Sequence, residues 1–405
     1  MTWLNLPPDS PFGVANLPYG VFSVDGNNPR AGVRIGDAVL DLAATLDDPV
    51  FAQPSLNVFM AQGPTRWREV RARLSDLLTD ERHRATVEPA LFELSRVRLR
   101  LPFTVADYVN FDASEHHART MGRMLLPDAE PLPANWRHLP MGYYSRSGTV
   151  VVSGTPVTRP QGQRKAPDET EPSFGPSRRL DFEAEVGFVV GTGSHPGRRV
   201  PIEDFREHVF GVCLVNDWAA RDIQEWERVP LGPFLGTSFA TSVSPWVVPL
   251  EALEQARVAA PPRDPHPLDY LRDTEEWGLD LELEIRLNGH VLSRPPFAAM
   301  YWTPSQLLAH LTGNGASIGT GDLYASGAVS GPDRDQRGSL AELSWNGAEP
   351  VELPDGTTRG FLADGDEVTI TATAPGPAGS RIGFGAVTGQ IMPAASPAGW
   401  PAPRS

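Results

Sequence analysis

The chain has 405 residues, of which 40% are hydrophobic and 8% aromatic, so it is long enough and apolar enough to fold around a large core. Its formal net charge is −15 at pH 7 and no basic stripe gathers along it, which argues against nucleic acid or an anionic membrane as a partner. The 41 prolines and 38 glycines indicate many turns and favour a β-rich body over a helical bundle.

Residues 1–102 are predicted to form a small N-terminal module. The stretch AGVRIGDAVLDLA predicts two alternating strands joined by a Gly-Asp turn, which is a hairpin pattern. In TRWREVRARLSDLL, Trp67, Val70 and Leu74 recur at helical spacing. A strand-like segment, SRVRLRLPF, closes the module. The chemistry-bearing patterns all lie beyond it, so we expect the module to support the rest of the chain or to form an oligomer surface.

Residues 103–405 are predicted to form a second unit in which strands dominate. Strand patterns occur in TVVVSG, LDFEAEVGFVVG, VFGVCLVND, SPWVVPL, LDLELEIRLNGHVLS, DEVTITATA and RIGFGAVTGQIM. Two helical segments, WAARDIQEWERV and TPSQLLAHLTG, interrupt the strands. The whole pattern predicts an α+β fold that is mostly β.

The stretch DYVNFDASEHHA places His116 and His117 at the start of a predicted helix. Adjacent helical residues point about 100° apart, so both do not easily bind one metal. One of them could be a general base, although two helix-terminal histidines without a function are the alternative from this segment alone. A histidine base needs an orienting acid, and the distant GSLAELSW offers Glu342 in a strand-like setting. Nothing local establishes that pair.

The segment LDFEAEVGFVV, here called the acidic strand, alternates apolar side chains with Asp181, Glu183 and Glu185. Carboxylates at positions i and i+2 lie close together, which is unfavourable unless solvent or a cation neutralises them. A solvated sheet face is the ordinary interpretation of this pattern. The segment LDLELEIRLNG repeats it with Glu282 and Glu284, which we expect to be hydrated.

Asp217 ends the buried-looking strand VFGVCLVND, where a helix is predicted to begin. Arg221, Gln224 and Arg228 follow at helical spacing, so the four polar side chains are expected on one helix face. A single Asp at such a junction is ordinarily an N-cap. The whole row, followed by the loop VPLGPFLG, is more typical of the wall of a polar cleft. Carboxylates of Asp217 and of the acidic strand would suit Mg²⁺ or Ca²⁺ better than zinc.

The cellular location is indicated by what the chain lacks. Cys213 is the only cysteine and lies in an apolar run, so we expect it to be buried as a small hydrophobe. The start, MTWLNLPPDSPFG, has neither the basic nor the apolar region of a secretory signal. No apolar run approaches the roughly 20 residues of a membrane-spanning helix. These features favour the cytoplasm.

The order of these segments resembles the fumarylacetoacetate hydrolase family, which includes the carbon–carbon hydrolase at the end of tyrosine breakdown. The similarity covers nearly the whole chain, and its most specific blocks are ANWRHLPMGYY, VVVSGTP, LDFEAEVGFVVG, NDWAARDIQEWERVPLGPFLG, MYWTPSQLLAH, GDLYASG, SLAELSW and FLADGDEVTI. The resemblance implies an SH3-like barrel over residues 1–102, a mixed β-sandwich roll over residues 103–405, and a homodimer.

The resemblance also implies a mechanism and its residues. In the family a divalent cation held by carboxylates grips the oxygens of a β-diketone, a His–Glu pair activates water, and Arg, Gln and Lys side chains stabilise the enolate that leaves. The matching residues are Glu183, Glu185 and Asp217 for the metal, His117 for the base, Glu342 for its orienting acid, Arg221 and Gln224 for the leaving group, and Tyr143 for a substrate contact.

Several positions depart from the family pattern. Asn110 stands where the remaining metal aspartate is expected, and Asp112 and Arg228 stand where the family has tyrosines. Thr237 replaces a lysine, and Leu126 replaces an arginine that holds a substrate carboxylate. Ala328 replaces a residue with a hydroxyl group. An asparagine can ligate Mg²⁺ or Ca²⁺ through its amide oxygen but adds no charge. Asp112 either restores a fourth negative charge or faces the substrate, where it would repel a carboxylate.

The departures bear directly on the substrate. Leu126 removes a carboxylate clamp worth about 1.5–3 kcal/mol. Thr237 removes the positive charge nearest to the enolate, a loss that commonly costs about 10²–10³ in rate, although Arg228 could partly substitute. The alternatives are therefore fumarylacetoacetate hydrolysis, a related metal-dependent reaction on another keto or enol substrate, such as decarboxylation, tautomerisation or ring closure, and an inactive relative.

Overall fold

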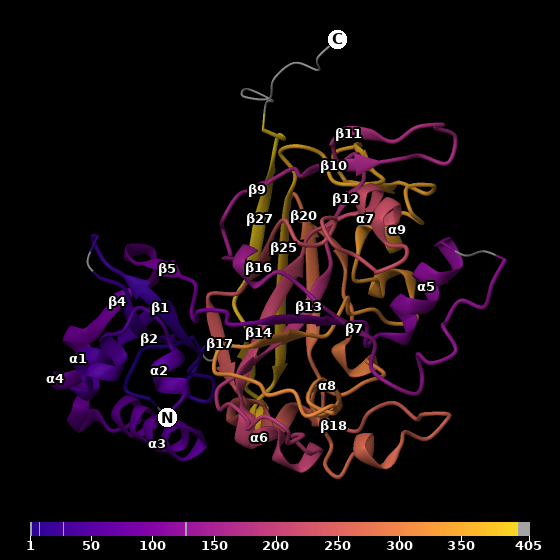
Figure 1. Ribbon diagram of the computed structural model, residues 1–405. Helices are drawn as coiled ribbons and strands as arrows, with labels where there is room; N and C mark the ends of the chain where they lie inside the picture. The colour runs from indigo at the N-terminus through magenta and orange to yellow at the C-terminus, as the bar shows by residue number, and fades with distance from the viewer. Residues whose placement is uncertain (1, 8, 27, 126–127, 396–405) are drawn as a thin grey trace.

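The computed structural model describes residues 2–7, 9–26, 28–125 and 128–395 (Figure 1). The predicted N-terminal hairpin is present: β2 (Arg30–Ile35) pairs antiparallel with β3 (Ala38–Asp41). The strand β1 (Tyr19–Ser23) pairs with β2 on one side and with β5 (Arg98–Arg100) and β17 (Trp246–Pro249) on the other. The strand β4 (Leu91–Glu93) completes this region of sheet beside β3.

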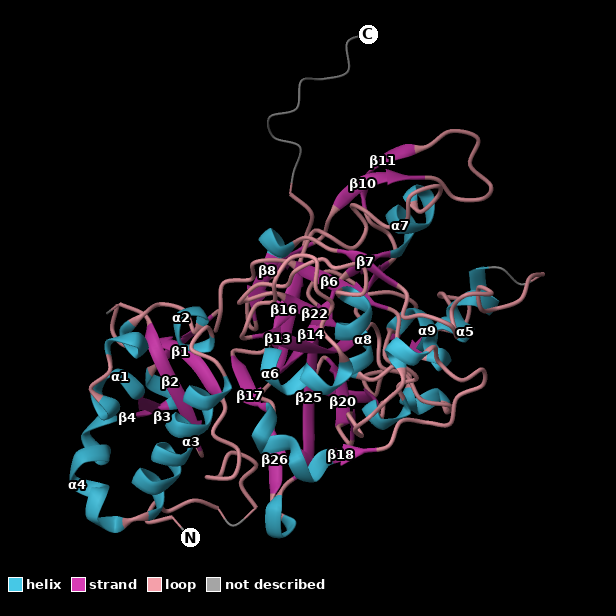
Figure 2. Cartoon of the chain, turned by 60° about the horizontal axis from the view of Figure 1, so that its bottom comes forward, coloured by secondary structure: helices cyan, strands magenta, loops and turns pink. Residues whose placement is uncertain are grey.

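Helices surround these N-terminal strands on their outer side (Figure 2). They are α1 (Leu42–Leu46), α2 (Asn57–Met60), α3 (Pro64–Thr79) and α4 (Arg84–Val87). The longest, α3, begins with a proline, whose fixed φ suits the first helical position. It buries Trp67, Val70 and Leu74, as the helical spacing predicts, together with Leu77 and Leu78.

The N-terminal strands and the strands that carry the site belong to one sheet. Its order runs β4-β3-β2-β1-β17-β14-β13-β22-β6-β7, with β14 (Val209–Asp217), β13 (Ala184–Val190), β22 (Leu323–Ala325), β6 (Tyr108–Phe111) and β7 (Gly142–Tyr144). At the junction Gly20 lies opposite Trp246, and a side chain on Gly20 would come within 2.7 Å of the Trp246 ring. The close approach of β1 to β17 therefore requires glycine there.

Both faces of this sheet are covered. Ala184, Val186 and Phe188 of β13 pack into one core, whereas Val189 packs into another that also contains Cys213. Cys213 is fully buried, as predicted. Since neither face of β13 reaches solvent, the alternation of acidic residues in this segment does not mark a wet surface.

A second sheet packs beside the first. Its order is β21-β20-β25-β27-β9, with β26 paired to β25, and the bounds are β21 (His290–Ser293), β20 (Glu282–Leu287), β25 (Glu367–Pro375), β27 (Val387–Met392), β9 (Val157–Thr158) and β26 (Arg381–Gly383). In β20 the side chain of Glu282 is 67% exposed and pairs with Arg381. The side chain of Glu284 is 24% exposed and pairs with Arg286. Glu282 is hydrated as expected, and Glu284 is only partly so.

Three helices border the site: α5 (Glu115–Leu125), α7 (Arg221–Glu227) and α9 (Leu340–Leu343). The predicted helix face containing Asp217 is wrong, because Asp217 is the last residue of β14 and pairs with Thr241 of β16 (Thr241–Val243). The helix begins only after β15 (Ala219–Ala220). The strand-like setting predicted for Glu342 is also wrong, because this residue lies in α9.

The remaining elements are short, apart from α8. They are β8 (Val150–Val152), β10 (Gln161–Arg164), β11 (Ser173–Pro176), β12 (Leu180–Asp181), α6 (Phe205–His208), β18 (Arg257–Val258), β19 (Gly278–Leu279), α8 (Pro304–Leu311), β23 (Val351–Glu352) and β24 (Thr358–Arg359). The predicted helix α8 starts with a capping box made by Thr303 and Gln306. Within the described ranges, no helix is both long and apolar enough to span a bilayer.

Candidate active site

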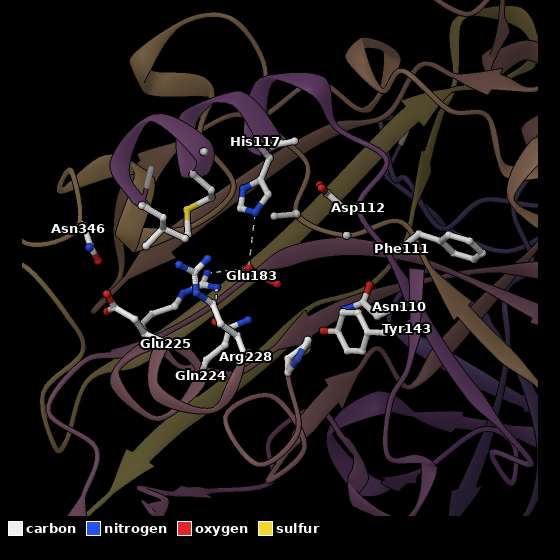
Figure 3. Close-up of a pocket in the computed structure, with 18 of the residues that line it drawn as sticks. Asn110, Phe111, Asp112, His117, Tyr143, Glu183, Gln224, Glu225, Arg228 and Asn346 are labelled. Carbon is white, nitrogen blue, oxygen red and sulfur yellow. Dashed lines mark hydrogen bonds and ion pairs between the residues drawn. The ribbon is translucent and has the colours of Figure 1, made fainter. Parts of the chain in front are cut away.

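A pocket of about 370 Å³ opens where β6 and β7 meet helices α5 and α7 (Figure 3). It collects most of the predicted site residues, namely Asn110, Asp112, His117, Tyr143, Glu183, Arg221, Gln224, Arg228 and Ala328. Four other predicted residues, Glu185, Asp217, Thr237 and Glu342, are buried. Leu126 lies outside the described residues.

The structure brings His117, and not His116, to Glu342. The Nδ1 atom of His117 lies 2.8 Å from Oε2 of Glu342, which also accepts hydrogen bonds from Ser330 at 2.9 Å and Ser339 at 3.0 Å. The other ring nitrogen, Nε2, lies 3.7 Å from Oε1 of Glu183, and Figure 3 shows the ring pointing from α5 toward this carboxylate. One nitrogen is thus anchored and the other is presented to the pocket.

The two histidines differ in their electrostatics as well. Burial alone lowers the pKa of His117, but the charge and hydrogen bond of Glu342 outweigh it and raise that pKa to about 9, with help from Glu183. For the half-buried His116, burial and then the charge of Arg337 lower the pKa. The two adjacent histidines therefore differ in burial and in their charged neighbours, and the assignment of His117 as the base stays a prediction.

Three buried carboxylates meet behind the pocket. Glu183, Glu185 and Asp217 each offer an oxygen, and these oxygens lie within 4.8 Å of one another. Burial, followed by the neighbouring negative charges, raises the pKa of Glu185 and of Asp217. Oε2 of Glu185 is buried and has no hydrogen-bond partner among the described residues. Such a set of hard, mutually repelling oxygens fits a divalent cation such as Mg²⁺ or Ca²⁺.

Asn110 lies inside this carboxylate cluster. Its Nδ2 donates to Oε1 of Glu185 at 3.1 Å and to Oδ2 of Asp217 at 2.8 Å. Its Oδ1 is buried and has no hydrogen-bond partner in the described parts of the chain. The amide nitrogen, rather than the oxygen expected for a metal ligand, therefore faces the carboxylates. The side chain turned by 180° about its last bond would present the oxygen there instead.

Arg221 links the carboxylate cluster to α7. Its NH2 donates to Oε1 of Glu183 at 2.6 Å, its Nε donates to Oδ2 of Asp181 at 2.8 Å, and its NH1 donates to Oε1 of Gln224 at 3.2 Å. Burial lowers the pKa of Arg221, but the charges of Glu183 and Asp181 outweigh this and raise it. The guanidinium therefore stays charged at every working pH.

Of the residues that depart from the family pattern, four line the pocket and Thr237 is buried; the four are Asn110, Asp112, Arg228 and Ala328. Asp112 accepts a hydrogen bond from Nε1 of Trp136 at 2.9 Å, and burial raises the pKa of its carboxyl. The pKa of Tyr143 is raised well above its usual value, chiefly by burial and then by the charge of Asp217. Arg228 is half-buried and lines the pocket, and its guanidinium has no hydrogen-bond or ion-pair partner within the described ranges. It places a positive charge in the wall of the pocket.

Several contacting residues were missed from sequence. Ser330 and Ser339 hold Glu342, Thr241 donates to Oδ1 of Asp217 at 2.7 Å, and Trp136 holds Asp112. One signal was available, because Ser339 and Glu342 form the S-x-x-E spacing of a capping box. The other contacts are made across large sequence separations and leave no local pattern. The apolar part of the lining, formed by Met121, Leu125, Pro131 and Pro133, was also not predicted.

Comparison with known proteins places the chain in a family. The C-terminal model of fumarylacetoacetate (FAA) hydrolase matches residues 104–392, and the fumarylacetoacetase N-terminal model matches residues 15–102. The chain belongs to the fumarylacetoacetate hydrolase family. It is 44% identical to human fumarylacetoacetase over 419 residues, covering 98% of this chain and 100% of that protein. The Arabidopsis thaliana fumarylacetoacetase is 42% identical over 415 residues, with 97% and 98% covered.

Solved structures agree on the fold. The fumarylacetoacetate hydrolase of Exiguobacterium antarcticum superposes with a TM-score of 0.56 at 17% identity, covering 93% of this chain and 99% of that one. A putative HpcE protein from Mycobacterium smegmatis gives 0.57 at 19% identity, with the same coverage. The mostly-β fold class with mixed sheets is thereby confirmed. The family relationship makes the chain a metal-dependent hydrolase of carbon–carbon bonds that acts on a small molecule.

Proposed function

We propose that the protein hydrolyses the carbon–carbon bond of a β-diketo acid, with fumarylacetoacetate or a related acylpyruvate as its substrate. The observation that carries the proposal is the position of Glu183. One oxygen of this residue lies 3.7 Å from the imidazole of His117 and 2.6 Å from the guanidinium of Arg221. A base, a cation and the carboxylate cluster therefore meet at a single point of the pocket.

The cluster would hold Mg²⁺ or Ca²⁺ through Glu183, Glu185 and Asp217, with Asn110 as a neutral fourth neighbour. When bound, the cation would supply Lewis-acid polarisation of the substrate's carbonyl groups. Neutralising Glu183 would also remove one of the charges that raise the pKa of His117, and so bring that residue closer to the range of a general base.

Residues of the chain would then transfer the proton and stabilise the leaving group. His117 takes a proton from water at Nε2 as the water oxygen bonds to a substrate carbonyl carbon, while Glu342 fixes Nδ1 and stabilises the imidazolium. The carbon–carbon bond then breaks to give a carboxylic acid and an enolate, and the imidazolium returns its proton to the enolate carbon. Arg221 and Gln224 would stabilise the negative charge that develops on the leaving enolate. The guanidinium of Arg228 would supply the positive charge that Thr237 does not.

A second candidate is the same site acting on a different, less anionic keto or enol substrate, by decarboxylation, tautomerisation or ring closure. Asp112 favours it, because this buried carboxyl lines the pocket and its Oδ1 has no partner among the described residues. A carboxyl whose pKa is raised by burial donates to a neutral oxygen more readily than it accepts a second carboxylate.

The deciding experiment follows the ultraviolet absorbance of fumarylacetoacetate and of simple acylpyruvates with purified protein, with and without Mg²⁺. Hydrolysis removes the diketone band, and we expect its loss to depend on the metal. If the metal binds and the band of every diketone persists, the hydrolytic proposal is wrong.

A combined variant tests how far the positions that depart from the family pattern limit turnover of fumarylacetoacetate. We expect wild-type turnover of fumarylacetoacetate to be poor and to rise when Asn110→Asp, Asp112→Tyr, Leu126→Arg and Thr237→Lys are combined. A wild-type kcat/KM already in the range of efficient enzymes, about 10⁶ M⁻¹s⁻¹ or above, would contradict this.

We also infer the finer architecture and setting. Residues 1–102 would be an SH3-like barrel and residues 103–405 a β-sandwich roll, an assignment supported by the short antiparallel run of β1–β5 and by the separate family models for the two parts. The protein would be a cytoplasmic homodimer. Light scattering coupled to size-exclusion chromatography measures the molar mass of the assembly and so tests for a dimer.

A further inference from the structure

Asp181 is a fully buried carboxylate that lies outside the pocket lining and contacts two parts of the site. Its Oδ2 accepts from Nε of Arg221 at 2.8 Å, and NH2 of the same guanidinium lies 2.7 Å away. Its Oδ1 accepts from the backbone N–H of Leu340 at 2.8 Å and of Phe182 at 2.8 Å. Both oxygens are therefore fully engaged.

Each contact leads to a different part of the chemistry. Arg221, held by Asp181 on one edge, reaches Glu183 with its NH2 group at 2.6 Å. Leu340 is the first residue of α9, and Glu342, two residues later in the same turn, lies 2.8 Å from Nδ1 of His117. One carboxylate thus connects the cation of the site to the helix that orients its base.

We propose that Asp181 is a positioning residue that fixes the guanidinium of Arg221 and the start of α9 relative to each other. This inference rests on the proposed function for its catalytic consequence, but the positioning itself does not depend on the identity of the substrate. With Asp181 in place, Arg221 is shared between two carboxylates and does not rest on Glu183 alone. Its NH1 edge then stays directed at Gln224.

The chemistry of the carboxylate explains why an amide does not serve equally well. The two oxygens of Asp181 accept from the Arg221 guanidinium and from backbone N–H groups of Phe182, Leu340 and Ala341. An asparagine has a single acceptor oxygen, and its NH₂ group carries only donors. If that oxygen keeps the backbone N–H groups, the NH₂ group must face the guanidinium, and the contact with Arg221 is lost.

Asp366 provides a matched control. It is also buried, and it accepts from Nε of Arg359 at 2.8 Å and from the backbone N–H of Ala363 at 2.8 Å. It therefore has the same kinds of partner as Asp181, but it does not line the pocket and contacts none of the predicted site residues. A purely structural effect of losing a buried carboxylate should appear equally in Asp366→Asn.

The test compares Asp181→Asn with Asp366→Asn in the full-length enzyme loaded with Mg²⁺. On a diketone that the wild type hydrolyses, we expect Asp181→Asn to lower kcat by about 30-fold or more while KM changes by less than about threefold. Asp366→Asn should leave kcat and KM within about threefold of the wild-type values, even if its melting temperature falls as much as that of Asp181→Asn. Equal kcat values for the two variants would overturn the proposal.

A second readout does not use activity. The Nε–H of Arg221 should give a slowly exchanging signal in ¹H–¹⁵N NMR spectra, identified by its disappearance in Arg221→Lys. We expect Asp181→Asn to make this proton exchange rapidly, and Asp366→Asn to leave it protected. Protection that persists in Asp181→Asn would refute the positioning role. If the wild type hydrolyses no diketone, the proposed function fails, while the NMR comparison still decides the inference.

A further variant covers the case in which Asp181→Asn does not fold. Asp181→Glu keeps the charge but moves the carboxylate by one methylene group, so Arg221 and α9 cannot both keep their present places. We expect it to lower kcat by about tenfold and to change the chemical shift of the Arg221 Nε–H. Wild-type kcat together with an unchanged shift would contradict the proposal.

Discussion

Glu183 lies between ionised groups supplied by two different helices. His117 comes from α5 and Arg221 from α7, and both approach the same oxygen of Glu183. Because the site is buried, each of these charges is felt strongly by the others. Substitution of one of these residues therefore changes the electrostatics of the whole group.

At this scale the two adjacent histidines make a clean comparison. His117→Ala removes the nitrogen held by Glu342 and should lower kcat by about 10²–10⁴, the usual contribution of a general base. His116→Ala, on the neighbouring half-buried side chain, should leave kcat within about threefold. Steady-state kinetics on one diketone measures both variants. Similar losses in the two would show that the base has been assigned to the wrong residue.

The raised pKa of His117 predicts how stability depends on pH. Because the folded-state pKa of about 9 exceeds the ordinary value near 6.5, this residue stabilises the folded state fully below about pH 6.5, and the contribution is lost as the pH rises through about 9. The free energy of unfolding of EDTA-treated protein should therefore fall by up to about 3 kcal/mol from pH 6.5 to 9.5. Urea titrations at each pH measure this free energy. The fall between pH 6.5 and 9.5 that is seen in the wild type should be absent in His117→Ala.

At the scale of elements, local pattern predicted the hairpin β2–β3, the helix α3 and the strand β14. In each of these the alternation or helical spacing coincides with the buried face. Local pattern failed at α9, because four residues are too few to show a helical period. It also failed at Asp217, because strand pairing with Thr241 holds this residue in β14. The i, i+2 spacing of Glu183 and Glu185 gave a local signal for paired carboxylates, but it did not place Asp217 beside them. That proximity follows from the antiparallel pairing of β13 with β14 and from the hydrogen bonds between the backbones of Glu183 and Asp217.

The cap of α9 offers a test of how that short helix serves the site. Ser339 accepts from the N–H of Glu342 and donates to its carboxylate at 3.0 Å. Ser339→Ala should lower the free energy of unfolding by about 1 kcal/mol and also lower kcat. Thr303→Ala removes the corresponding cap of α8, away from the pocket, and should cost similar stability without loss of kcat. Equal kcat values in the two variants would mean that the cap is not needed for catalysis.

For the whole molecule, the clustered carboxylates make the free energy of unfolding depend on divalent cations. Ligand present at 100 times its Kd stabilises the folded state by about 2.7 kcal/mol. We expect Mg²⁺ or Ca²⁺ to raise the melting temperature of EDTA-treated protein, and Glu185→Gln to abolish most of this shift. Calorimetry and elemental analysis measure the effect. The absence of both bound ion and shift in the wild type would exclude this metal site.

The pairing of β1 with β17 bears on the evolution of the protein and on the expression of its parts. Trp246 is almost fully buried, and it packs against Phe22, Val24 and Val39 from the N-terminal part of the chain. If residues 1–102 were removed, β17 would become an open, apolar edge next to β14, and such edges act as templates for aggregation. Expression of residues 103–405 alone should therefore give insoluble material. For the same reason, evolution should retain residues 1–102 together with residues 103–405 in one chain.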